Sequence, residues 1–452
     1  MNRAQRSKGD AVRIGAGAGY SGDRIDPAVE LALKGSLDYL VFECLAERTI
    51  ALAQKSRLLD PQLGYDPLLE ERMEAVLPIC AEKKIRIISN MGAANPVSAA
   101  ARTREIAQRL GLRGLRIAAV TGDDVLSLVR NNGISFREDV QIAKTDPGKL
   151  VSANAYLGAD GIVEALGAGA DIILTGRVAD PSMFLAALIH EFDWATNDWQ
   201  RLGQGTVIGH LLECAGQLTG GYYADPGFKD VFGLARLGFP IAEVCRDGGA
   251  LLTKVDGSGG RITRSTCIEQ LLYEIEDPSS YLTPDVTADF SHVSFEERGP
   301  DQIQVLGGTG TPRPEMLKVS VGHHDGYIGE AQISYAGPGA LARAELAQDI
   351  LVERLKGAAL DDLRFSFIGV NSIHGGRLSR MDHEPYEVRL RVAARAETMS
   401  SAAMVLREVE ALYTNGPAGG GGVSGSTRET IGILSSLIPR ELVRYEVHYQ
   451  ES

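Results

Sequence analysis

The first half of the chain alternates short apolar runs with amphipathic segments. The apolar runs occupy residues 12–15, 39–43, 85–90, 115–121 and 171–175. Each is almost uninterrupted, which is typical of a strand buried on both faces of a parallel sheet. The amphipathic segments between them include residues 27–35, 101–110 and 155–169 and predict crossover helices. Residues 12–220 are therefore predicted to form an α/β domain with a mostly parallel sheet built from βα repeats.

The pattern changes after about residue 220. Residues 221–315 mix short β runs with glycine and proline and predict an irregular β-containing region. Residues 316–452 predict an α+β region with two hairpin–helix units in ββαββα order. In the first unit MLKVSVG and YIGEAQISYAG flank a predicted turn, HHDG, and in the second DLRFSFIGVN and YEVRLRVAARA form the hairpin. The glycine-rich segment 416–425 is predicted to be a flexible loop.

Composition narrows the classes of partner. The 452 residues carry a formal net charge of −13 without a basic block, which argues against nucleic acid and anionic membranes as partners. No apolar run approaches the roughly 20 residues of a membrane span, so we expect a cytoplasmic protein. The 5 cysteines include no C-x-x-C pair, which argues against a disulfide framework and a thiolate zinc site. We expect no bound metal.

Polar side chains follow the predicted parallel strands, where ligands of open α/β sheets bind. Asn90 follows the third strand and Asp123 the fourth, while Thr175, Arg177 and Asp180 follow the fifth. A guanidinium at a strand end suits a carboxylate or phosphate, and an ion pair with Asp180 is the alternative for Arg177. Glu43, at the end of the second strand, Asp123 and Asp180 are candidate general bases, and each is also suited to capping a helix.

The stretch VRIGAGAGYSGDR at residues 12–24 places glycines at the spacing of a dinucleotide fingerprint. The acidic Glu43 after the next strand fits that interpretation. However, Asp26 and Pro27 signal the helix start beyond the glycines, and the negative charge there opposes a pyrophosphate. We therefore expect a substrate-binding loop and keep NAD(P) binding as the alternative. The candidate binding residues of this loop are Gly17, Gly19, Ser21 and Gly22.

A predicted helix over residues 204–220 carries several reactive groups on one face. His210, Glu213 and Cys214 lie at positions i, i+3 and i+4, a spacing that suits proton transfer or an activated thiol. Burial of Cys214 as a small apolar residue, with structural hydrogen bonds for the other two, is the alternative. In the second half, Asn371 and His374 follow an apolar strand and are the candidates there for reaching a cleft.

Eight ordered segments across about residues 12–445 resemble the acyclic terpene utilisation A family. They are GAGAGYSGDR, YLVFECLAERT, ISNMGAANP, ILTGRVADPSMFLA, GHLLECAGQLTGGYYADPG, GFPIAEV, TCIEQLLYEIEDPSSYLTPDVTADF and YAGPGALARAELA. The resemblance implies a role in bacterial breakdown of branched or terpenoid acyl-coenzyme A compounds, and it transfers no catalytic residue.

From the resemblance and the strand-end residues we expect an enzyme of acyclic terpene, branched acyl-coenzyme A or carboxylate catabolism, either a lyase or a hydratase. The expected partner is a small-molecule carboxylate or coenzyme A thioester, with no certain cofactor, in a homo-oligomer. An NAD(P)-dependent oxidoreductase and a non-catalytic subunit of a catabolic complex are the alternatives.

Overall fold

The computed structural model describes residues 11–131, 147–379 and 383–452, and the chain divides into two compact units. The first unit contains Met1–Gly322 and Ile433–Ser452, and the second contains His323–Gly432. The chain enters the second unit within strand β14 (Met316–Ala336) and leaves it within strand β17 (Gly421–Pro439). Residues 221–315 thus belong to the same unit as the N-terminal half.

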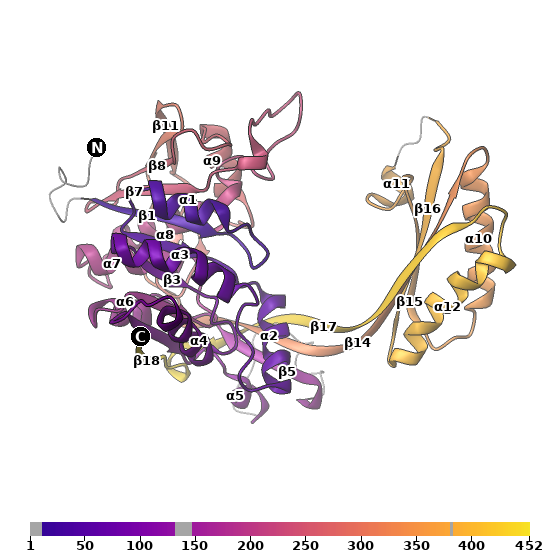
Figure 1. The fold of residues 1–452 in the computed structure, drawn as a ribbon, viewed down its shortest axis with the longest axis horizontal. Coiled ribbons are helices and arrows are strands. Elements are labelled where there is room, and N and C mark those ends of the chain that lie inside the picture. The colour runs from indigo at the N-terminus through magenta and orange to yellow at the C-terminus, as the bar shows by residue number, and fades with distance from the viewer. Residues whose placement is uncertain (1–10, 132–146, 380–382) are drawn as a thin grey trace. The chain divides into compact units, whose positions relative to one another are not determined.

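A large mixed sheet forms the centre of the first unit (Figure 1). Five strands pair in parallel in the order β1-β2-β3-β6-β4. Their bounds are β1 Ala11–Ala18, β2 Tyr39–Phe42, β3 Arg86–Ser89, β4 Arg116–Thr121 and β6 Ile172–Thr175. The apolar runs of the first half supply these strands, and their side chains are almost entirely buried because helices cover both faces. The predicted α/β class is confirmed.

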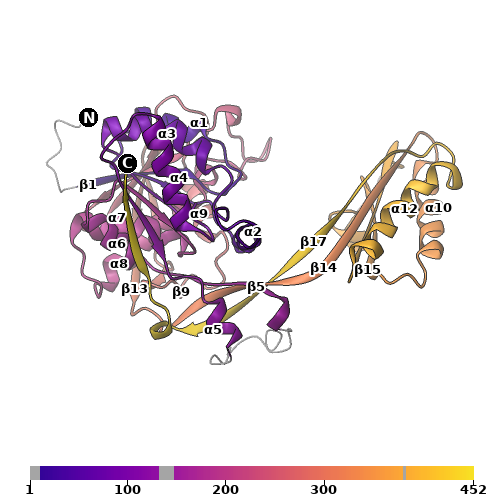
Figure 2. The same cartoon turned by 60° about the horizontal axis from the view of Figure 1, so that its bottom comes forward.

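Two groups of helices cover the sheet (Figure 2). One group contains α1 (Asp26–Lys34), α3 (Leu69–Lys83) and α4 (Pro96–Arg109). The other contains α6 (Asp160–Gly167), α7 (Asp180–Phe192) and α8 (Trp199–Glu213). Proline stands in the first turn of α1, α4 and α7, where its missing N–H costs no helical hydrogen bond.

The topology of the sheet creates a point where neighbouring strands lead to opposite faces. Strand β6 lies between β3 and β4, although β4 precedes it in the chain. The connection after β3 enters α4 of the first helix group, and the connection after β6 enters α7 of the second. Ligands of open α/β sheets bind at such a switch point, outside the carboxyl ends of the strands.

Antiparallel strands extend both edges of the sheet. Beside β1 follow β7 (Pro240–Cys245), β8 (Ala250–Lys254), β12 (Gln302–Leu306) and β11 (Ser294–Gly299). The C-terminal strand β18 (Glu446–Glu451) pairs with β4. The remaining elements of the first unit are α2 Glu47–Leu59, α5 Leu126–Arg130, β5 Leu150–Ala155, α9 Arg264–Leu272, β9 Tyr281–Leu282, β10 Thr287–Asp289 and β13 Thr309–Thr311.

The second unit is an antiparallel sheet covered by two helices. Its strands follow the order β15-β16-β14-β17, where β15 spans Asp361–Ile368 and β16 Glu387–Ala396. Helices α10 (Ala340–Arg354) and α12 (Met399–Asn415) pack together against this sheet, and a short helix, α11, spans Gly375–Leu378. The unit has its own apolar core, in which Ile333, Leu390 and Val405 are fully buried.

Four local predictions differ from the structure. The segment HHDG is not a turn, because β14 continues through it. The first predicted hairpin is therefore a single strand, and the second half begins in the order β14, α10, β15 rather than ββα. The helix predicted over 204–220 ends at Glu213, and Ala215–Gln217 forms a separate short 3-10 helix. Residue 155 belongs to β5, and α6 begins only at Asp160. Within the glycine-rich segment 416–425, strand β17 begins at Gly421.

Candidate functional site

The loops after β2 and β3 are joined by a buried hydrogen-bonded pair. The Asn90 side chain donates from Nδ2 to Glu43 Oε1 at 2.9 Å, and its Oδ1 accepts from the Cys44 backbone N–H at 2.7 Å. The Leu45 backbone N–H donates to the same Glu43 oxygen at 2.8 Å. Burial is the main reason that the pKa of Glu43 lies well above its usual range, and the nearby Asp180 charge adds to the shift. Burial therefore favours the protonated form of Glu43.

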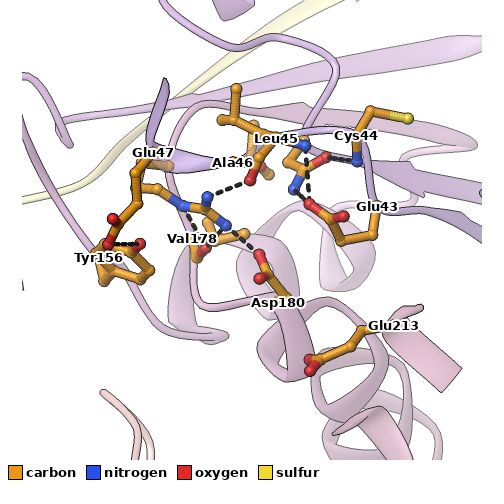
Figure 3. Close-up of polar contacts among 12 residues, drawn as sticks. Glu43, Cys44, Leu45, Ala46, Glu47, Tyr156, Val178, Asp180 and Glu213 are labelled. Carbon is orange, nitrogen blue, oxygen red and sulfur yellow. Dashed lines mark hydrogen bonds and ion pairs between the residues drawn. The ribbon is translucent and has the colours of Figure 1, made fainter. Parts of the chain in front are cut away.

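Arg177 lies at the centre of the site and is only 1% exposed. Its Nε donates to the Val178 carbonyl at 2.8 Å, and Nη1 donates to the Leu45 carbonyl in the loop after β2. Its Nη2 forms an ion pair with Asp180 (Figure 3). Of the two interpretations of Arg177, the structure thus contains the ion pair with Asp180. The carbonyl contacts fix the guanidinium in place and connect the loops after β2 and β6.

Asp180 is the accessible acid of this group. It begins α7, and its side chain is 33% exposed, whereas its partner Arg177 is buried. Burial raises the pKa of Asp180, and the Arg177 charge opposes that rise. The positive end of the α7 dipole also favours a carboxylate at this position. Asp180 therefore presents a carboxylate that is held by a cation and reached by solvent.

Asp123 and Thr175 are enclosed. Asp123 Oδ2 accepts from the Arg177 backbone N–H at 2.9 Å and from Asn154 Nδ2 at 2.8 Å. Burial raises its pKa to about 6. The Thr175 hydroxyl, also buried, donates to the Gly176 carbonyl at 3.0 Å. Both side chains are buried and form hydrogen bonds with the backbone of the loop after β6.

His210 and Glu213, on α8, form a buried pair. His210 Nδ1 lies 2.8 Å from Glu213 Oε1, and Nε2 lies 3.2 Å from the Leu271 carbonyl oxygen. Burial opposes protonation of His210, yet the Glu213 charge and hydrogen bond raise its pKa overall. Burial raises the pKa of Glu213 to about 7, although His210 lowers it. The second oxygen of Glu213, Oε2, is buried without a hydrogen-bond partner among the described residues.

Glu213 is electrostatically coupled to the strand-end group. Among the charges that raise its pKa is that of Asp180. Figure 3 shows the side chains of Asp180 and Glu213 beside one another, below the loop that carries Leu45. We refer to Glu43, Arg177, Asp180 and Glu213 as the acid–arginine cluster. It joins the ends of β2 and β6 to helix α8.

Cys214 ends α8 and differs from the expectation of an activated thiol. Burial and then the Glu213 charge raise the pKa of its thiol, which disfavours the thiolate. Its backbone packs against Gly19, where a Cβ atom would lie only 2.5 Å from the Cys214 carbonyl carbon. This close approach gives Gly19 a packing role.

The other groups of the glycine loop also interact within the protein. The Gly19 backbone N–H donates to Asp23 Oδ2 at 2.9 Å, so a carboxylate of the loop itself occupies the place of an external anion. The fully buried Arg72 donates from Nη2 to the Ser21 carbonyl at 2.7 Å. Gly17 packs against the Phe42 ring, and a Cβ at Gly22 would meet the Tyr20 ring. These contacts weigh against a dinucleotide phosphate in this loop.

Three site residues gave no signal in the sequence. The Tyr156 ring, which follows β5, lies 4.6 Å from Arg177 Cζ and 5.2 Å from Lys318 Nζ. Its hydroxyl donates to Glu47 Oε1 at 3.1 Å, and Lys318 Nζ forms an ion pair with the same oxygen at 2.7 Å. Lys318 is 48% exposed, so Tyr156, Glu47 and Lys318 lie between Arg177 and the solvent. Tyr156 stood inside the helix predicted over residues 155–169, so the rule for strand ends did not select it.

Asn371 and His374 belong to the second unit. The Asn371 side chain accepts from the Phe367 backbone N–H at 2.8 Å, which caps the end of β15. His374 is exposed and precedes the short helix α11. The structure therefore assigns Asn371 a hydrogen bond within the second unit.

The described ranges of the chain contain no group of three or more His, Cys, Asp or Glu side chains arranged to bind a metal ion. In the same ranges, none of the helices has both the length and the hydrophobicity needed to cross a bilayer.

Comparison with known proteins gives one match. Neither a curated protein nor a solved structure matches the chain. Residues 12–449 match the family described as acyclic terpene utilisation family protein AtuA, which confirms the resemblance identified from the sequence motifs. The match includes every residue of the acid–arginine cluster. The chain belongs to the AtuA family of acyclic terpene utilisation proteins.

Proposed function

We propose that the chain is a catabolic enzyme that adds water to, or eliminates a group from, a branched carboxylate or acyl-coenzyme A compound. The observation that carries this proposal is the acid–arginine cluster at the switch point of the sheet. It combines a solvent-reached carboxylate, Asp180, with a second acid, Glu213, whose pKa is raised to about 7. Hydratases and lyases need such a pair, because one group removes a proton and the other delivers one.

The environments of the two acids suggest their roles. Arg177 stabilises the charged form of Asp180, which suits the general base that takes a proton from water. Glu213 stays partly protonated near neutral pH, which suits the general acid that delivers a proton to carbon. His210 forms a hydrogen bond with Glu213 and acts as a positioning residue. In the elimination direction the same two groups exchange roles.

The test is direct turnover of candidate substrates. Purified protein is incubated with branched unsaturated acyl-coenzyme A thioesters and with the free acids, and the gain or loss of one water is followed by mass spectrometry. Asp180→Asn and Glu213→Gln should each lower kcat by about 100-fold to 10,000-fold, the usual contribution of a general acid or base.

A matched control separates chemistry from charge. Glu71, an exposed acid in the first turn of α3, supplies Glu71→Gln, which should retain wild-type turnover. Turnover that survives in the double variant Asp180→Asn/Glu213→Gln would remove the cluster from the mechanism. If the wild type converts none of the thioesters or acids in either direction, the enzyme proposal fails in favour of a non-catalytic subunit.

A further inference from the structure

A pocket of about 390 Å³ lies in the first unit and includes no residue of the acid–arginine cluster. It is bounded by the end of β4, by the first turn of α6 and by the segment that follows β17. Its volume falls within the range of about 300–1,000 Å³ that is usual for small-molecule sites. The pocket is therefore large enough for a ligand group.

The pocket has an excess of positive charge. Arg313, Arg440 and Arg444 line it, and Asp160 is the one acidic side chain among the lining residues. Asp160 Oδ2 lies 3.6 Å from an Arg313 nitrogen. The chain as a whole has a net charge of −13, whereas the residues lining the pocket include three arginines and one acidic residue. The charge of the pocket is therefore opposite in sign to that of the whole chain. An anion would relieve the repulsion among the guanidinium groups.

The arginines differ in how they are held. Arg440 is half-buried, and its Nη2 donates to the Pro284 carbonyl at 2.5 Å while Nε donates to the Pro314 carbonyl at 3.2 Å. Burial and then the Arg313 charge lower the pKa of Arg440. Arg313 and Arg444 are exposed. Arg440 is thus fixed by the backbone, whereas Arg313 and Arg444 are exposed residues that can pair with an anion.

The N-terminus of α6 adds a partial positive charge, which the Asp160 carboxylate in its first turn partly offsets. Asp160 and Gly161, the first two residues of the helix, line the pocket. The N-terminus of a helix carries a partial positive charge and favours bound anions. At Gly161 a Cβ atom would lie 2.7 Å from a Val120 methyl carbon, so glycine lets the helix end approach the strand closely.

We propose that this pocket binds a phosphate dianion, carried either by the phosphomonoester group of coenzyme A or by free phosphate. Planar guanidinium groups match phosphate oxygens in pairs, which makes arginine the suitable residue type. The coenzyme A source rests on the proposed function, whereas the phosphate chemistry does not. Leu157, which lines the pocket, donates its backbone N–H to the Arg177 carbonyl at 3.1 Å, so the pocket wall adjoins the acid–arginine cluster.

The experiment is isothermal titration calorimetry of the full chain with coenzyme A, dephospho-coenzyme A and sodium phosphate, in a chloride buffer. Arg313→Ala and Arg444→Ala should each weaken phosphate-dependent binding by roughly tenfold, the value of one charge-assisted hydrogen bond, and the double variant should lose it. Arg440 is left in place because its bonds to backbone carbonyls support the fold.

A matched control is Arg298→Ala, which removes an exposed arginine that pairs with Glu296 outside the pocket. It should bind as the wild type does. If coenzyme A binds more tightly than phosphate and dephospho-coenzyme A does not, the ligand is the phosphomonoester of coenzyme A. If coenzyme A and phosphate bind equally well, the ligand is free phosphate. No phosphate-dependent binding, or binding that the double variant leaves unchanged, overturns the proposal.

Because this measurement needs no turnover, it is independent of the catalytic test. A protein that binds phosphate here and converts no substrate would contradict only the proposed function. A protein that hydrates thioesters and binds phosphate equally well without Arg313 and Arg444 would contradict only the proposed pocket.

Discussion

Burial opposes the ionisation of four carboxyl groups at the site, and each is compensated in a different way. Arg177 forms an ion pair with Asp180. Two amide groups donate to Glu43, and His210 pairs with Glu213. Asp123 accepts two hydrogen bonds, and the backbone of Gly176 lies so close that a Cβ there would be 2.4 Å from Asp123 Oδ1. Asp123 is thus enclosed, and its hydrogen bond to the Arg177 backbone supports the Arg177 loop.

This support should be visible in the pH dependence of stability. The pKa of Asp123 is raised from 3.8 to about 6 in the folded chain. Because the folded pKa is the higher one, its contribution to stability is present below pH 3.8 and is lost as the pH rises through about 6. The Asp123→Asn variant has no carboxyl group to titrate and so does not lose this stability. The unfolding free energy of the variant minus that of wild type should therefore increase by up to about 3 kcal/mol as the pH rises from about 4 to about 7.

Urea unfolding of both proteins across that pH range measures the difference. The amide oxygen of the variant can still accept from the Arg177 N–H, which keeps the loop geometry. Asp26→Asn is the control, because Asp26 is exposed and Arg24 lowers its pKa. Parallel stability curves for wild type and Asp123→Asn would show that Asp123 does not titrate as described.

At the scale of elements, glycine sets how closely β1 approaches α8. A Cβ at Gly19 would lie 2.5 Å from backbone atoms of Cys214, which cannot move without shifting the end of α8. Gly19→Ala should therefore lower the free energy of unfolding by about 1–3 kcal/mol, the usual cost of overpacking. Gly167→Ala is the matched control, because no atom lies within 4 Å of its Cβ position at the end of α6.

Gly167→Ala should leave stability unchanged or raise it by up to about 1 kcal/mol, since alanine favours the helix. Thermal and urea unfolding of the two variants provide the comparison. Equal stability of Gly19→Ala and wild type would mean that the contact between β1 and α8 relaxes freely.

Elements with strong local patterns could be predicted, and those set by distant partners could not. The parallel strands were visible because burial on both faces produces an uninterrupted apolar run, as at Tyr39–Phe42. In HHDG, the polar residues and Gly326 gave the local signature of a turn. In the structure β14 continues through them, and β16 pairs with it from Tyr327 onward. That pairing joins residues from 69 positions apart at Tyr327 and Ala396 to 51 positions apart at Ala336 and Glu387, which local propensity does not record.

The same limit applies to the candidate site: residues at strand ends could be predicted from the sequence, and contacts between distant segments could not. Glu43, Asn90 and Arg177 follow strands, and in the structure hydrogen bonds connect their loops at the carboxyl ends of those strands. Tyr156 was assigned to a helical segment and therefore missed. Lys318 lies more than 160 residues from Tyr156 in the chain, so only the tertiary fold brings its ammonium group to that ring. The occupied hydrogen bonds of Arg177 likewise could not be inferred from the sequence.

At the scale of the whole molecule, the chain builds separate apolar cores. The main core of the first unit surrounds the central sheet and includes Leu174. The core of the second unit, which includes Leu390, is formed by its own sheet and two helices. A chain with separate cores does not satisfy the conditions for a single two-state transition. Damage to one core should therefore stay largely within its unit.

Leu390→Ala tests this independence. Leu390 is fully buried in the second core, so its truncation should cost about 2–5 kcal/mol there. Hydrogen exchange followed by mass spectrometry should show faster exchange in β15, β16 and α12, with peptides from β1–β3 unchanged. Leu174→Ala, in the equally buried first core, should give the opposite pattern. Faster exchange throughout both units in either variant would show that the two cores unfold as one cooperative structure, and the acid–arginine cluster would then depend on the second unit for its stability.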